Sequence, residues 1–182
     1  TTLALGARTL TLGDSVNTTF SGGISGTGGL VKQGSGTLTL GGASTYTGGT
    51  TINAGTLALG AGGSLAAGGA VTLNAAGTSF DISAAGGNPT IGALSGVAGS
   101  QVALGTRSLI VGNASSTTYA GTIGGTGGLV KQGSGTLILS GASTYTGGTT
   151  IGAGVLTLGN GGLTGNVIGN IVDNGTLVFS RA

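Results

Sequence analysis

The feature that most constrains this chain is a long internal repeat. The segment GTGGLVKQGSGTL begins at Gly26 and recurs 99 residues later at Gly125, and the segment GASTYTGGTTI recurs at the same spacing. The alignment extends over residues 4–60 and 103–159, with roughly 40 of 57 positions identical. Because the sequence is tandem, we expect the structure to be periodic along the chain as well.

The composition excludes several common classes of protein. Glycine accounts for 45 of 182 residues and charged residues for only 4%, whereas about a quarter of an ordinary globular domain is charged. Hydrophobic residues make up 38% of the chain, which is more than the low hydrophobicity of a disordered protein. Collagen is excluded because glycine follows no three-residue period and Pro89 is the only proline.

Hydrophobic residues alternate with small or polar ones over many segments of three to five residues, and glycine ends most of these segments. Such alternation is typical of half-buried β-strands joined by tight corners. Helix is disfavoured because each interior glycine costs a helix about 1 kcal/mol, and the best helical candidate is residues 64–70. The leucines that we predict to point into the core of the repeat copies are Leu38, Leu40, Leu57, Leu59, Leu137, Leu139, Leu156 and Leu158.

These patterns predict an all-β fold, a right-handed parallel β-helix of about seven coils with three short strands per coil. A duplicated block with the same inward leucines can stack on itself and extend one core, whereas a β-sandwich encloses a core of fixed size. At about 4.8 Å per coil the rod would be roughly 35 Å long. We expect one continuous solenoid over residues 1–182, with repeat copies at about 4–60 and 103–159, intervening coils at 61–102 and a further coil at 160–182.

Few residues could support catalysis. The chain has no His, Cys or Glu, and its only carboxylates are Asp14, Asp81 and Asp173. A Ser-His-Asp triad is impossible, and a pair of catalytic carboxylates would have to lie within about 5 to 10 Å. We therefore expect no enzymatic activity, no cofactor, no metal and no small-molecule substrate. We expect structural or turn roles for the three aspartates. Asp14 aligns with Asn113 in the second copy, which indicates a turn role for this position.

Two pairs of side chains recur at equivalent positions of the repeat. We expect Lys32 and Lys131 to lie on the rod surface as solvated or gatekeeping charges, and Tyr46 and Tyr145 to cap corners with their hydroxyls near solvent. The alternative for both pairs is contact with a ligand, which for the tyrosines would be shallow stacking against a glycan. Nucleic acid is not an expected partner because the basic residues are widely spaced along the chain. They are Arg8, Lys32, Arg107, Lys131 and Arg181.

The string GTGGLVKQGSGTLTLGGASTYTGGTTINAGTLALG at residues 26–60 closely resembles the autotransporter-associated β-strand repeat, also called the passenger-associated transport repeat, of Gram-negative type V secreted proteins. The second copy departs from it by Gly152 and Val155, where the first copy has Asn53 and Thr56. The resemblance implies a secreted or surface-displayed passenger whose partner is its own C-terminal translocator barrel, which is not in this chain. Proteins of this kind are often adhesins or their stalks, and the repeat is associated with efficient translocation.

The residues also indicate how export could be assisted. A chain without disulfides, and without charges over residues 33–80, can pass a narrow pore extended and then gain one coil of hydrogen bonds and leucine burial at a time. We therefore expect a structural segment of a passenger stalk. Because no signal-peptide pattern opens the chain at Thr1, we expect a mature product or an excised piece.

The main alternative is a self-associating filament, because a β-helix exposes unpaired backbone at each end and low net charge gives little repulsion. Binding to a host surface, to glycans or to ice is a further alternative. The chain lacks the repeated T-x-T on one coil face that ice binding would need, and it lacks the clustered aromatic residues that glycan binding would need.

Overall fold

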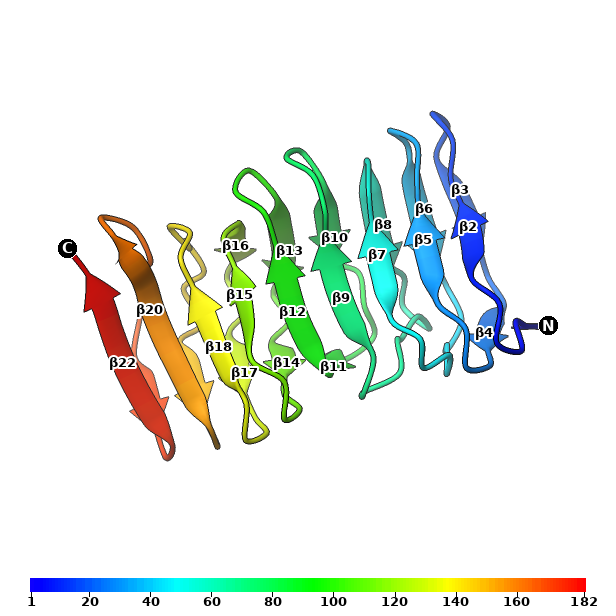
Figure 1. Cartoon of the computed structure of the whole chain (residues 1–182). Helices are drawn as coiled ribbons and strands as arrows, with labels where there is room; N and C mark the ends of the chain where they lie inside the picture. The colour runs from blue at the N-terminus through cyan, green and yellow to red at the C-terminus, as the bar shows by residue number, and fades with distance from the viewer.

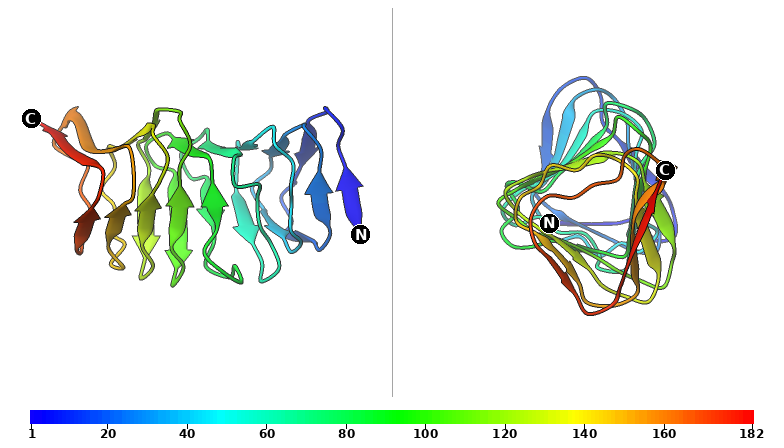
Figure 2. Two further views of the ribbon diagram at one scale, coloured as in Figure 1. Left: turned by 90° about the horizontal axis from the view of Figure 1, so that it is seen from below. Right: turned by 90° about the vertical axis from the view of Figure 1, so that its left-hand side faces the viewer.

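The computed structural model describes all 182 residues as a parallel β-solenoid, with coils stacked in a row from the N-terminus to the C-terminus (Figure 1). Viewed along its axis, the solenoid is roughly triangular, with strands on the sides and turns at the corners (Figure 2). The fold has 22 strands and no helix, so it has no helical segment that could cross a membrane. The prediction of an all-β parallel solenoid is confirmed.

Three faces run along the solenoid, and every strand pair in them is parallel. The first face is a sheet of nine strands: β2 (Leu10–Leu12), β5 (Leu30–Lys32), β7 (Thr50–Ile52), β9 (Ala70–Leu73), β12 (Ala93–Gly96), β15 (Thr117–Tyr119), β18 (Thr136–Leu139), β20 (Val155–Gly162) and β22 (Thr176–Arg181). The second face has six: β3 (Thr18–Phe20), β6 (Thr37–Leu40), β8 (Thr56–Leu59), β10 (Ser79–Asp81), β13 (Gln101–Gly105) and β16 (Thr122–Gly125).

The third face changes its strands along the axis. Near the N-terminus it consists of β1 (Thr2–Ala4) and β4 (Gly23–Ser25). Further along, a five-stranded sheet takes over, with β11 (Thr90–Ile91), β14 (Leu109–Val111), β17 (Leu129–Lys131), β19 (Thr149–Ile151) and β21 (Ile171–Asp173). The first face is the only one with a strand in every coil, and it therefore sets the register of the stack.

The nine strands of the first face correspond to nine coils, so the prediction of about seven coils is wrong. The coils are shorter than expected, since β2, β5 and β7 begin at residues 10, 30 and 50. Tight corners make this possible. At Gly34, between β5 and β6, the backbone has φ of 70°, and a Cβ atom would overlap the Asp14 carbonyl of the preceding coil. Nine coils at about 4.8 Å span roughly 40 Å.

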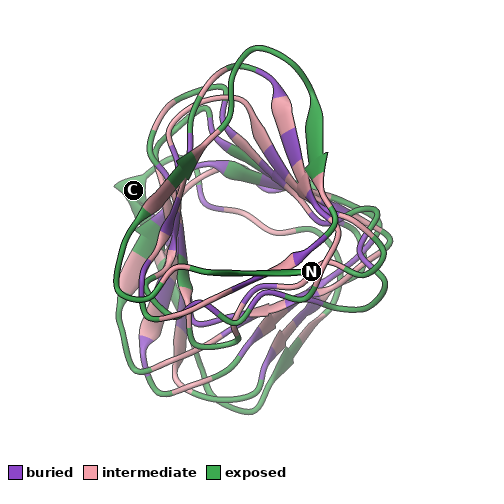
Figure 3. Ribbon diagram, turned by 90° about the vertical axis from the view of Figure 1, so that its right-hand side faces the viewer, coloured by how far each residue is buried: buried purple, intermediate pink, exposed green.

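Inward side chains form columns parallel to the axis. On the second face Leu57 pairs in register with Leu38 on one side and Phe80 on the other. The residues between inward positions point outward and are only partly buried, as the alternating colours of Figure 3 show. Each fully buried leucine contributes about 1.5–3 kcal/mol. The eight leucines of the repeat copies lie in this core, each no more than 3% exposed: Leu38, Leu40, Leu57, Leu59, Leu137, Leu139, Leu156 and Leu158.

The two repeat copies lie on different faces of the solenoid. Strand β5 of the first copy belongs to the first face, whereas the equivalent β17 belongs to the third face. In the same way β6 lies on the second face and its equivalent β18 on the first. The 99-residue spacing therefore covers about four and two-thirds coils rather than a whole number. Equivalent leucines remain inward and extend one core, as predicted, but they enter different columns.

The column arrangement predicts that replacing a leucine by alanine lowers the free energy of unfolding more inside a column than at an exposed position. Leu57 is fully buried between two inward neighbours, so Leu57→Ala should lower the free energy of unfolding by about 2–5 kcal/mol, because the cavity cannot collapse. Leu3 is 37% exposed in the first coil, and Leu3→Ala should cost about 1 kcal/mol or less. Chemical denaturation followed by far-ultraviolet circular dichroism measures both values. Equal losses of unfolding free energy in the two variants would contradict the column arrangement.

Candidate functional site

Each repeat copy contains a lysine whose side chain points into the solenoid. Lys32 ends β5 and Lys131 ends β17, and they are only 0% and 2% exposed. The expectation that they lie on the rod surface is therefore wrong. In the Leu-Val-Lys strands the first and third residues share the inward side and only the valine points outward. The period-two alternation that identified the inward leucines could also have identified these lysines as inward residues.

Each lysine caps backbone carbonyl groups at a corner. The Lys32 Nζ donates hydrogen bonds to the carbonyl oxygens of Gln33 at 2.6 Å, Gly34 at 2.7 Å and Ala54 at 3.1 Å. All three N–H donors of the ammonium group are thus used. Two acceptors belong to the same corner and the third to the next coil, so the lysine joins neighbouring coils. In the second copy Lys131 donates to Gln132 at 2.7 Å, Gly133 at 2.9 Å and Ala153 at 3.3 Å.

Burial lowers the pKa of both lysines below the ordinary value of 10.5, because the charged form loses its hydration. For Lys32, the carboxylate of Asp14 in the preceding coil acts in the opposite direction and favours the ammonium form. The second copy has Asn113 at the position equivalent to Asp14, so Lys131 lacks this stabilisation. The two copies therefore differ by one charge beside an otherwise equivalent buried lysine.

The repeated tyrosines also lie inside the solenoid. Tyr46 and Tyr145 are no more than 1% exposed, contrary to the expectation that their hydroxyls lie near solvent. Each hydroxyl is 2.6 Å from a threonine Oγ1, that of Thr50 or Thr149, and burial raises the pKa of both tyrosines to about 12. Tyr119, the third tyrosine, is equally buried, so no tyrosine ring is available to stack against a glycan.

The three aspartates serve as turn residues, as the sequence predicted. Each carboxylate accepts a hydrogen bond from the backbone N–H two residues later, which closes an Asx turn. The pairs are Asp14 with Val16 at 2.8 Å, Asp81 with Ser83 at 2.8 Å and Asp173 with Gly175 at 3.0 Å. Asn113 makes the same bond to Ser115 at 2.8 Å, so the amide replaces the carboxylate without loss of the turn.

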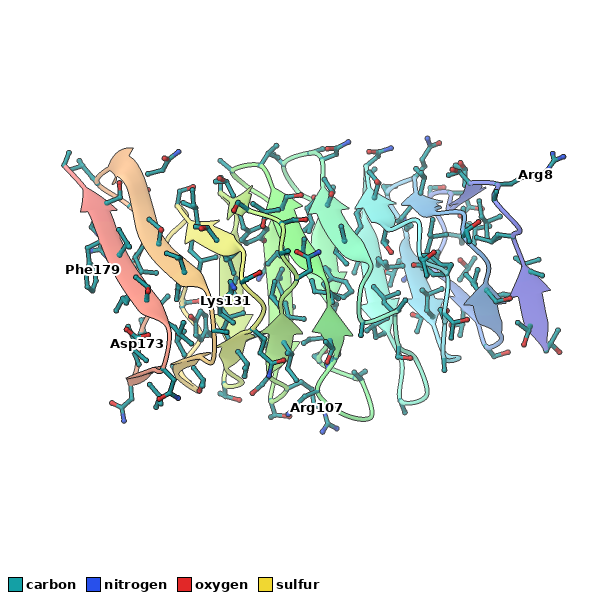
Figure 4. All side chains as sticks on the ribbon, turned by 60° about the horizontal axis from the view of Figure 1, so that its bottom comes forward. Arg8, Arg107, Lys131, Asp173 and Phe179 are labelled. Carbon is teal, nitrogen blue, oxygen red and sulfur yellow. The ribbon has the colours of Figure 1, made fainter.

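The charged side chains do not gather into a reactive site. No group of three or more His, Cys, Asp and Glu residues comes together that could hold a metal ion. Asp14 follows the first strand of the first face, Asp81 lies in β10 and Asp173 in β21, so the three carboxylates lie in different coils. Figure 4 shows Arg8 and Arg107 extending beyond the ribbon, whereas Lys131 lies within it. The buried lysines thus stabilise corners and face no cavity for a substrate.

Comparison with known protein families identifies the repeat itself. Residues 30–59 and 129–158 each match the family described as the passenger-associated transport repeat. Each matched stretch spans four strands, β5–β8 in the first copy and β17–β20 in the second, and includes the buried lysine, the buried tyrosine and four of the inward leucines. No match was found among curated proteins or among solved structures.

Removing the lysine donors should destabilise the corners. Lys131→Met keeps the apolar stem but leaves three carbonyl oxygens without their partner, so the free energy of unfolding should fall by about 1–3 kcal/mol. Arg8→Met, which removes an exposed cation, should change it by about 0.5 kcal/mol or less. Urea denaturation of both variants tests this role. A Lys131→Met protein as stable as the parent would show that the capping bonds contribute nothing.

The charge difference between the copies predicts a reciprocal pKa change. Asp14→Asn should lower the pKa of Lys32 further, and Asn113→Asp should raise that of Lys131, because both substitutions alter the charge while the Asx turn is kept. Nuclear magnetic resonance titration of the lysine side chains measures both values. If neither pKa moves, the carboxylate and the ammonium group do not interact.

Stability should rise and then fall on the alkaline side. At pH values between the lowered pKa of the lysines in the folded chain and 10.5, the unfolded chain binds more protons than the folded chain. The free energy of unfolding therefore increases with pH in this range. Between pH 10 and about pH 12 the folded tyrosines retain protons that the unfolded chain has lost, so the free energy of unfolding decreases. Denaturation at a series of pH values gives the profile, and a steady decline from neutral pH upward would contradict the lysine contribution.

Proposed function

We propose that this chain, which carries two passenger-associated transport repeats, is a structural segment of a secreted or surface-displayed autotransporter passenger. In this role it forms part of an adhesin-like stalk, and its coil-by-coil folding assists passage across the outer membrane. Its partner during export is the translocator domain of the same passenger system. The observation that carries the proposal is that each coil is completed by bonds to its immediate neighbours alone.

Backbone hydrogen bonds join residues that are one coil apart in the sequence. The Leu10 N–H donates to Gly29, for example, and the Leu30 N–H donates to Gly49, in both cases at 2.9 Å. A new coil therefore needs only about 20 further residues to complete its ladder, and closing a loop of this length costs little more entropy than closing a shorter one. Folding can thus follow the chain as it emerges, as in other solenoids with nearest-neighbour contacts.

Each added coil also covers the inward side chains of the coil before it. In the third coil Ile52, Leu57 and Leu59 are all fully buried, and each contributes about 1.5–3 kcal/mol when it leaves water. This gain is made only outside the pore, where the chain can coil. Every completed coil therefore opposes backward movement of the chain.

The remaining features agree with a spacer rather than a catalyst. The chain has no cysteine that could form a disulfide and obstruct extended passage. Its carboxylates are used in turns and its tyrosines are buried, which leaves no assembled acid–base pair and no exposed tyrosine. We infer that the segment has no enzymatic activity of its own.

Secretion of core variants tests the proposal. The chain is placed before a type V translocator in a Gram-negative host, and surface arrival is followed by protease accessibility on intact cells. Leu137→Asp with Leu139→Asp should slow arrival several-fold, because the coil can no longer bury its inward side. The matched control changes the outward residues of the same strand, Thr136→Asp with Ile138→Asp, and should export at close to the parental rate. Equal export of the two double variants would refute stepwise coiling as the assisting force.

A further inference from the structure

A groove lies at the corner that follows the first face in the second half of the chain. It has a volume of about 440 Å³, and its lining residues come from the fifth to the eighth coil, those of β12, β15, β18 and β20. Each of these coils is followed by another on the first face. The groove therefore lies within the stack and does not depend on either end of the chain.

The groove arises because successive coils have corners of unequal length. Leu139 is in register with Leu158, and the next register pair is Ala142 with Asn166. Between these two pairs the seventh coil has only two residues, whereas the eighth has seven, residues 159–165. The additional residues form a loop, which we call the wall loop, beside a close corner.

The opposite wall is the corner of the fifth coil. Four residues, 97–100, separate β12 from β13, whereas only Ala120 and Gly121 separate β15 from β16 in the sixth coil. Figure 1 shows the longer corner rising above the shorter one. Two close corners are thus flanked by two longer ones, and the groove crosses about 14 Å along the axis at 4.8 Å per coil.

The wall loop is held in place at its base. A Cβ atom on Gly165 would overlap the backbone nitrogen of Gly159, so the two ends of the loop are in contact. The Thr164 Oγ1 donates a hydrogen bond to the Ser140 carbonyl at 2.7 Å, which fastens the loop to the seventh coil. Compact surface loops with closed ends are frequently functional, and in solenoids such insertions often lie on the binding face.

An irregularity in the strand ladder places a polar side chain in this wall. The register of β20 with β22 shifts between Leu158 and Gly162, and Asn160 lies within the shift. Gly159 and Gly161, with φ of 91° and 76°, allow the backbone to turn there. Bulges of this kind re-aim side chains and are over-represented next to functional sites.

Three polar side chains of the groove form no hydrogen bond within the chain. They are those of Thr122, Ser140 and Asn160, all of which are exposed or partly exposed. The residues 99 positions earlier carry no such groups; they are Gly23, Gly41 and Ala61. The polar lining therefore belongs to the second half of the chain and is not required by the repeat fold.

We propose that this groove binds a neutral oligosaccharide. None of its lining residues is ionisable, so a charged ligand would lose hydration without gaining a counter-charge from them. A purely apolar ligand would leave the hydroxyl and amide groups unpaired. The carboxamide of Asn160 offers a donor and an acceptor side by side, which match two adjacent sugar hydroxyls. The methyl groups of Ala98, Ala120 and Ala142 lie against the C–H surface of the sugar.

Ring stacking has no part in this site, in agreement with the lack of clustered aromatic residues. Tyr119 is fully buried, and its hydroxyl donates to the Thr122 carbonyl at 3.1 Å, so it supports the groove instead of lining it. Recognition by hydrogen bonds and shape alone should be weak, with a dissociation constant of about 1 mM. The site is independent of the proposed role in export, because it requires only the folded chain.

Titration of the isotopically labelled full chain with sugars tests the site by nuclear magnetic resonance. The neutral probes are maltotriose, cellotriose, mannotriose and triacetylchitotriose, and the charged comparison is sialyllactose. At least one neutral probe should shift the backbone signals of residues 120–122, 140–142 and 159–165. No shift with any neutral probe, shifts only outside these residues, or tighter binding of sialyllactose would overturn the proposal.

Variants that copy the first half of the chain separate binding from folding. Asn160→Ala and Ser140→Gly introduce the residues found 99 positions earlier, and Ser140→Gly keeps the carbonyl that accepts from Thr164. Each should weaken binding about two- to tenfold, the loss expected for one hydrogen bond. Thr150→Ala removes an outward hydroxyl from the third face of the seventh coil and should bind as the parent does. Equal affinities of the three variants, with unchanged circular dichroism spectra, would overturn the site.

Discussion

The stacking of one coil directly on the next is the interaction on which the rest of this structure depends. Strands on all three faces are parallel and in register, so the spacing between coils is set by the backbone ladder at about 4.8 Å. At several corner positions this spacing leaves no room for a side chain. A Cβ atom on Gly28 would overlap the Arg8 carbonyl, and the equivalent Gly127 meets Arg107 in the same way. Close stacking therefore explains many of the glycines.

The same spacing explains why a lysine can be buried in an otherwise apolar column. A corner turns several carbonyl groups inward, and the ladder cannot supply donors to all of them. The ammonium group reaches two carbonyls of its own corner and one of the next coil, in both repeat copies. An ammonium group is suited to this position because it has three donors and no acceptor that would be left unpaired.

A stack of this kind has no intrinsic end. Each interior coil covers the inward side chains of the coils before and after it, and the first face continues through all nine coils. Nearest-neighbour contacts thus allow coils to be added one at a time during the proposed export.

The sequence by itself determined the fold class, the inward leucines and the turn role of the aspartates, because period-two alternation and Asx turns are local properties. It did not determine the number of coils or the face on which each repeat copy lies, since both depend on corner lengths summed over the whole stack. It also did not place Lys32 and Tyr46 inside. Their polar character favoured the surface, and only the tertiary structure brings together the carbonyl and hydroxyl partners that make their burial favourable.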